Sequence, residues 1–152
     1  MDTNEKHQVM HDRIQHELDR IEADYGVTIL FACESGSRAW GFPSQDSDFD
    51  VRMVYHHPAD WYLDLQRRRD VIEEPIVDEL DISGWDIDKT LRLLRKSNPN
   101  ILEWVGSPII YREHERFGHV RELLDTGFDH RASVLHYRNM ALNNKRQWLD
   151  RD

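Results

Sequence analysis

The chain has 152 residues, 29 of them acidic and 20 basic, and a formal net charge of −9. This length predicts a single domain, 1–152, with one hydrophobic core, and the acidic excess excludes a large basic surface for non-specific nucleic-acid binding. No apolar run approaches the ~20 residues of a membrane span, and no signal-peptide core is evident. The single cysteine, Cys33, excludes an internal disulfide. We therefore expect a cytoplasmic protein, with this thiol buried and inert.

The first elements can be assigned from the spacing of apolar residues. They recur every three or four positions over 3–25, which predicts an amphipathic helix that ends at Gly26. The apolar run 27–33 predicts a buried strand. A Gly-Ser turn and a short helical stretch follow, and alternation over 48–55 predicts a second strand.

The second half of the chain predicts more strands and then helices. Two strands are expected over 69–74 and 76–82, followed by a turn at Ser83-Gly84. Ser83 is a suitable N-cap for a helix over about 85–96. Further helices are predicted over 100–105, 113–124 and 131–149. This order predicts an α+β (α/β-like) fold, a small mixed β-sheet backed by helices, with a core at about 27–112 and C-terminal helices at about 113–150.

Two carboxylates on the second strand are the main chemical signal. Asp48 and Asp50 are separated by one residue, so a strand places them on the same face. Two like charges held so close repel each other unless a cation lies between them. Mg²⁺ prefers a few carboxylate oxygens together with phosphate oxygens. The pair predicts a metal-dependent phosphoryl or nucleotidyl transfer site, with a solvated edge strand as the alternative.

The preceding turn supplies candidate phosphate ligands. Gly36 lets the backbone approach a phosphate closely, and Ser37 adds a hydroxyl and an amide donor. A Gly-Ser pair alone is an ordinary turn, and its value comes from its spacing to the aspartates. Arg38 and Arg52 are candidates to neutralise a triphosphate. Arg52 shares the carboxylate face, so a structural ion pair with Asp50 is an equal alternative.

A third carboxylate is expected from a neighbouring strand, because two-metal transfer needs ligands for both ions. Asp81 is the first candidate, since it comes near the C-terminal end of its predicted strand, just before a turn. Glu79, on the same face, is the second. Lys89, in the first turn of the next predicted helix, is a further candidate for the nucleotide, with an ordinary surface cation as the alternative.

The nine histidines show no clear metal motif. His7 and His11 have the i, i+4 spacing of a zinc pair on a helix, but no third ligand is evident. We interpret them as a solvent-exposed pair.

Together these motifs resemble a known signature. Gly36–Gly41 followed by Ser47–Arg52 is similar to the DNA polymerase β-like nucleotidyltransferase superfamily, and the Val-Arg ending to its predicted branch associated with RNA repair. The segments 79–86, 97–104 and 107–111 are similar to the second half-domain of that branch. The likeness covers about 27–112.

The resemblance implies a polymerase β-like palm with a nucleotide and two Mg²⁺ ions bound above the sheet, Mn²⁺ being an alternative ion. Asp48 and Asp50 would ligate the metals, and Asp81 would hold the catalytic ion and help to activate the acceptor hydroxyl. Gly36 and Ser37 would hold the phosphates of an NTP, with ATP the first choice.

The expected function is therefore transfer of an NMP from an NTP to an acceptor hydroxyl, such as an RNA end. One alternative is a protein-modifying, AMP-transferring enzyme of the antitoxin-like kind. Another is a non-catalytic nucleotide-binding or partner-binding module. Members of this branch usually continue with further C-terminal helices, so we expect a truncated or naturally short chain whose acceptor site is completed by a homo-oligomer or a partner chain.

Overall fold

The computed structural model describes residues 3–41, 47–66 and 68–148. It contains a five-stranded mixed sheet with the strand order β3-β4-β2-β1-β5. The strands are β1 (Thr28–Glu34), β2 (Phe49–His56), β3 (Val71–Glu73), β4 (Leu80–Asp86) and β5 (Ile110–Glu113). The helices are α1 (Thr3–Tyr25), α2 (Ala59–Tyr62), α3 (Ile87–Arg95), α4 (Pro99–Val105), the 3₁₀ helix η1 (Glu115–Phe117), α5 (Gly118–Gly127) and α6 (His130–Trp148). The predicted α+β class is confirmed.

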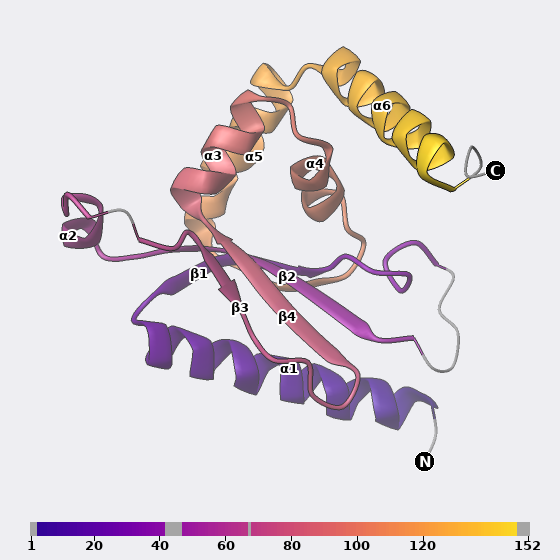
Figure 1. The fold of residues 1–152 in the computed structure, drawn as a ribbon. Helices are drawn as coiled ribbons and strands as arrows, with labels where there is room; N and C mark the ends of the chain where they lie inside the picture. The colour runs from indigo at the N-terminus through magenta and orange to yellow at the C-terminus, as the bar shows by residue number, and fades with distance from the viewer. Residues whose placement is uncertain (1–2, 42–46, 67, 149–152) are drawn as a thin grey trace.

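Helix α1 covers one face of the sheet, while α3, α4 and α5 lie on the other (Figure 1). The buried face of α1 presents Ile14, Leu18 and Ile21, which are fully buried, as the spacing of apolar residues predicted. The helix ends at Gly26, whose φ of 61° is a left-handed conformation that glycine adopts without strain. The predicted helix over 3–25 is confirmed to the residue.

The opposite face of the sheet packs against the later helices. Phe31 stacks on Phe117 with ring centroids 4.5 Å apart. Val54 of β2 and Leu94 of α3 belong to the same buried cluster, and so does the fully buried Cys33. The prediction of a buried thiol is thus confirmed, and the sheet has a hydrophobic layer on each side.

The strand topology brings two distant segments together. β2 pairs antiparallel with β1 but parallel with β4, in a register that runs from Phe49↔Leu80 to Tyr55↔Asp86. β3 pairs antiparallel with β4 and forms a hairpin with it. Because β2 and β4 run in the same direction, their first residues lie side by side at one end of the sheet.

The prediction of a strand over 76–82 and a turn at Ser83-Gly84 is wrong. The turn comes earlier, at Asp78 and Glu79, whose φ values are 47° and 66°. β4 then passes straight through Ser83-Gly84. A Cβ on Gly84 would lie 2.3 Å from Met53 Cγ, so this glycine permits close strand packing rather than a turn.

Two helix starts also differ from the prediction. Asp86, not Ser83, caps α3, and its side chain accepts a hydrogen bond of 2.8 Å from the Asp88 amide. The helix expected from 113 begins only at Gly118, because β5 and then η1 occupy the preceding residues.

After Ser37, the described residues up to Gly41 form turns, and the rest of the short helical stretch predicted there lies outside the described residues. Among the helices of the described ranges, none combines the length and apolar character required to cross a membrane.

Candidate functional site

Two carboxylates lie side by side where β2 and β4 begin. Asp50 and Asp81 are direct partners in the parallel ladder. Asp50 lies four residues before Val54, and Asp81 lies four residues before Trp85. Val54 and Trp85 belong to the hydrophobic cluster that packs against α3, α4 and α5. Because side chains four residues apart on a strand share a face, both carboxylates lie on that side of the sheet. Asp50 is 30% exposed and Asp81 is 27% exposed. They are therefore half-buried and accessible from one edge.

Arg52 lies between these carboxylates. Its Nη2 atom is 2.7 Å from Asp81 Oδ2 and 3.4 Å from Asp50 Oδ1. One guanidinium group thus offsets the repulsion between two like charges. Arg52 was expected either to neutralise a triphosphate or to form a structural ion pair with Asp50. The structure contains the ion pair with Asp50 and a second one with Asp81.

Asp81 reaches this position for a reason that differs from the prediction. It lies at the N-terminal end of β4, not at the C-terminal end of a strand before a turn. It nevertheless meets Asp50 because β4 is parallel to β2. Glu79 instead lies exposed in the preceding turn, where its carbonyl accepts a hydrogen bond of 2.7 Å from the Phe49 amide. The geometry favours Asp81 over Glu79 as the partner of Asp50.

Asp48 lies directly before β2 and is exposed. Its carbonyl accepts a hydrogen bond of 3.3 Å from Arg38 Nε. The predicted strand began one residue too early, so Asp48 is on the segment that leads into β2. Of the three predicted metal ligands, the structure thus pairs Asp50 with Asp81 and leaves Asp48 on an exposed segment beside them in the sequence.

The Gly-Ser turn touches the Asp50 carboxylate. A Cβ built on Gly36 would lie 1.8 Å from Asp50 Oδ2, so only glycine fits here. The Ser35 amide also donates to the Asp50 carbonyl at 2.9 Å. Ser37 is exposed in the same turn. The structure thus brings the predicted phosphate-binding turn directly to the predicted metal-binding strand.

Glu34 is a residue of this site that the sequence analysis missed. It ends β1 and is fully buried. Its Oε1 accepts hydrogen bonds from the Asp50 amide at 2.8 Å and the Gly36 amide at 3.3 Å, while its Oε2 accepts from the Tyr111 hydroxyl at 2.7 Å. Burial and this hydrogen bond raise the pKa of Tyr111. Glu34 therefore ties the turn, β2 and β5 together.

The printed contacts of two predicted cations, Arg38 and Lys89, are with groups other than the Asp50 and Asp81 carboxylates. The Arg38 guanidinium packs 3.8 Å from the centre of the Phe49 ring and donates to the Ser47 carbonyl at 2.7 Å. Lys89 Nζ is 3.4 Å from Asp70 Oδ1 and follows the far end of β4. Asp81 and the end of β4 are separated by about 16 Å of extended strand. The structure does not bring Lys89 to Asp81.

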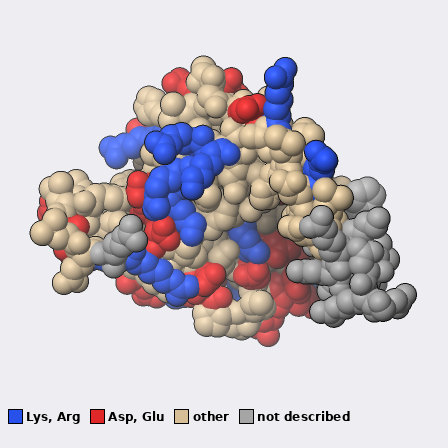
Figure 2. Space-filling model, turned by 45° about the horizontal axis from the view of Figure 1, so that its top comes forward, with Lys and Arg blue, Asp and Glu red and all other residues tan. Residues whose placement is uncertain are grey.

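The chemistry of the donor set fits a magnesium-bound nucleotide. Within the part of the chain that the structure describes, no three His, Cys, Asp or Glu side chains are already grouped to hold a metal ion. Mg²⁺, however, is usually held by one or two carboxylates together with substrate phosphates and water. On the face in Figure 2, acidic and basic side chains meet in a hollow near the centre rather than forming one basic surface.

Comparisons with known proteins identify relatives of the chain. The family described as "RNA repair pathway DNA polymerase beta family" matches residues 10–152. The uncharacterized protein YcgL of Bacillus subtilis (strain 168) is 55% identical over 141 residues, which are 92% of this chain and 54% of that protein. The chain thus spans about half the length of this curated relative. No solved structure matches.

Proposed function

Because the chain belongs to the RNA repair pathway DNA polymerase beta family, we propose that it is a magnesium-dependent enzyme that transfers an NMP from an NTP to an acceptor hydroxyl. One observation carries this proposal. The carboxylates of Asp50 and Asp81 face each other at the starts of two parallel strands, and the Gly36 turn touches Asp50. A site for nucleotidyl transfer needs this combination of metal ligands and a close backbone turn.

The proposed roles follow from these positions. Asp50 and Asp81 would ligate Mg²⁺, with Asp48 as a further ligand at the exposed mouth of the site. The amides of Gly36 and Ser37 would donate to the phosphates. When bound, Mg²⁺ would neutralise the triphosphate and the charge that develops on the attacking and leaving oxygens. Arg52 would then turn from the carboxylates toward a phosphate, because the metal replaces its positive charge.

In the reaction, the acceptor oxygen forms a bond to the α-phosphorus and loses its proton. The bond between the α-phosphorus and its bridging oxygen breaks, and pyrophosphate leaves. Catalysis would depend mainly on positioning and charge neutralisation. We propose ATP as the first NTP, an RNA end as the acceptor, and the cytoplasm as the location. We also propose that a second copy of the chain or a partner chain completes the acceptor site.

The first test is a thermal-shift titration with the four NTPs, with and without Mg²⁺. A ligand that binds only the folded state raises the melting temperature. We expect a magnesium-dependent rise that is lost in Asp50→Asn and Asp81→Asn. Asp125→Asn, a change of an exposed carboxylate on α5, is the matched control and keeps the rise. If no nucleotide raises the melting temperature of the wild-type protein or of the Asp125→Asn control, the proposed site is wrong.

The second test asks for transfer. The protein is incubated with α-labelled ATP, Mg²⁺ and RNAs that carry defined ends, and the label is followed into RNA. Labelling that requires Asp50 supports the proposal. If label instead enters protein, the AMP-transferring alternative is correct. Magnesium-dependent binding without transfer to any acceptor would support the nucleotide-binding module.

A further inference from the structure

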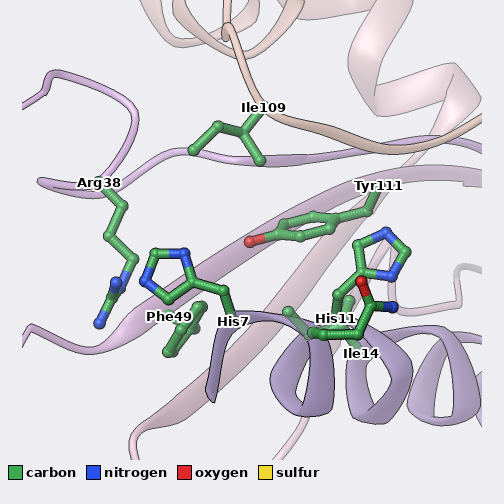
Figure 3. A pocket seen from close by; sticks show the side chains of 8 residues that line it. His7, His11, Ile14, Arg38, Phe49, Ile109 and Tyr111 are labelled. Atoms are coloured by element: carbon green, nitrogen blue, oxygen red, sulfur yellow. The ribbon is translucent and has the colours of Figure 1, made fainter. Parts of the chain in front are cut away.

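A pocket of about 330 Å³ lies between α1 and the sheet, on the opposite face from the Asp50 and Asp81 carboxylates (Figure 3). α1, the Gly-Ser turn, β2 and β5 each contribute to its wall. Five of its lining side chains are basic or aromatic: His7, His11, Arg38, Phe49 and Tyr111. The other three are a glutamine and two isoleucines. The volume is at the lower end of the roughly 300–1,000 Å³ of small-molecule sites.

The chemistry of this wall differs from that of the whole chain. None of the eight described lining residues carries a carboxylate, although the chain has 29 acidic residues and a net charge of −9. Arg38 is always charged, and no carboxylate among these lining residues offsets its charge. The pocket is thus locally cationic, which complements an anionic ligand.

The aromatic groups indicate what else the ligand carries. The guanidinium carbon of Arg38 lies over the Phe49 ring, 3.8 Å from its centre. The Tyr111 ring forms a second wall, and its hydroxyl end points toward the side of the pocket where Arg38 and His7 lie (Figure 3). Aromatic rings and stacked guanidinium planes are the surfaces on which proteins hold unstacked bases.

We propose that this pocket binds one nucleotide unit, with the base against Phe49 and Tyr111 and the phosphate near Arg38 and His7. The unit is either a free mononucleotide or the terminal nucleotide of an RNA. This nucleotide is distinct from the NTP of the carboxylate site. Tyr111 links the two places, because its hydroxyl donates to Glu34, which in turn accepts from the Asp50 amide.

The test follows the imidazole signals of wild-type protein by NMR during titration with AMP. Single His→Gln changes assign the signals. We expect His7 and His11 to shift, while His16, which is exposed on the same helix outside the pocket, does not. Adenosine and inorganic phosphate are titrated separately. If inorganic phosphate binds as tightly as AMP, the pocket is only an anion site and the proposal is overturned. If adenosine binds as tightly as AMP, the phosphate is not recognised and the proposal is overturned as well.

A pair of variants then tests affinity. His7→Glu combined with His11→Glu reverses the charge of the wall, and we expect about tenfold weaker binding of AMP or of a short single-stranded RNA. His16→Glu is the matched control and keeps wild-type affinity. Tighter binding of RNA than of AMP identifies an RNA end as the ligand, and the reverse identifies a free nucleotide. Unchanged affinity in the double variant overturns the proposal.

The same variants separate this inference from the proposed function. The magnesium-dependent thermal shift with ATP, which depends on Asp50, is expected to survive His7→Glu with His11→Glu. If that shift is lost while the variant remains folded, the pocket belongs to the NTP site and is not a second one. If ATP never binds but AMP still shifts His7 and His11, the pocket stands and the proposed function fails.

Discussion

Gly36 and Asp50 lie in direct contact, so that a methyl group on the glycine would fall 1.8 Å from the aspartate Oδ2 atom. This contact joins the turn proposed for phosphate to the strand proposed for metal. Neither element can move independently, because Glu34 accepts hydrogen bonds from both backbone amides. The site is therefore held as one rigid unit in the folded chain.

Gly36→Ala should disturb this unit directly. The added Cβ forces the Asp50 carboxylate or the turn to shift, which costs about 1–3 kcal/mol of unfolding free energy. We expect lower stability in urea and loss of the magnesium-dependent shift with ATP. Gly118→Ala is the control, because a Cβ there meets nothing within 4 Å. Gly118 is the first residue of α5 and already has helical dihedral angles, so this change should stabilise the protein by about 0.4–1 kcal/mol. Wild-type nucleotide binding in Gly36→Ala would contradict the prediction.

Arg52→Gln should make the stability depend on magnesium. Without the guanidinium, Asp50 and Asp81 repel each other, and unfolding free energy falls by about 1–2 kcal/mol. Millimolar Mg²⁺ should restore more of the melting temperature in this variant than it adds to wild type. Adding Asp81→Asn removes the repulsion and should also remove the magnesium effect. Arg95→Gln, at an exposed position of α3, should respond as wild type does.

Tyr111→Phe should reveal the cost of leaving Glu34 without its hydroxyl donor. The Oε2 atom of a fully buried carboxylate then lacks this hydrogen bond, which costs about 1–3 kcal/mol of unfolding free energy. Tyr25→Phe is the matched control, because that hydroxyl binds Glu74 at an exposed position. Its removal should cost under about 1 kcal/mol. Equal losses in the two variants would show that the Glu34 network adds nothing to stability.

Cys33 should stay unreactive in the native protein. Burial raises the pKa of its thiol to about 12, so little thiolate exists at pH 8. Iodoacetamide should label it only in denaturant, and labelling of the native protein at the denatured rate would refute this.

Stability should also depend on this thiol at high pH. The pKa of Cys33 in the folded state lies above the value of about 8.5 for a free cysteine, so its contribution is complete below pH 8.5 and is lost as the pH rises toward 12. Urea denaturation between pH 7 and 10 should show a decline that is smaller in Cys33→Ala. Parallel declines in the two proteins would contradict this assignment.

The fold was predictable where one face of an element carries a regular apolar pattern. The α1 helix followed from Ile14, Leu18 and Ile21, which all point into the core. The bounds of β4 could not be predicted in this way, because Ser83-Gly84 has the composition of a turn. The reason for the glycine is the Met53 side chain of the neighbouring strand. Such a tertiary contact leaves no mark in the local sequence.

The candidate site was likewise predictable only in part, where local spacing rather than a tertiary contact determines a residue's position. The spacing of Gly36 and Asp50 predicted that a turn would face a strand, and the two are in contact. Asp81 was predicted because it was expected at the C-terminal end of a strand, but it lies at the N-terminal end of β4. It meets Asp50 because β4 pairs in parallel with β2. Glu34 had a sequence signal, since it is a carboxylate at the end of an apolar run. Its buried role depends on Tyr111, which is distant in the sequence and approaches through β5.

The parallel pairing of β2 and β4 also has a consequence for the order of folding. Asp50 and Asp81 come from strands that are separated by α2 and the β3 hairpin, so local contacts cannot assemble them. Non-local strand pairing carries a loop-closure cost and forms slowly. The two halves of the site therefore meet only when the centre of the sheet closes. A nucleotide added during refolding would report on this late step, while the helical signal of α1 would report on earlier ones.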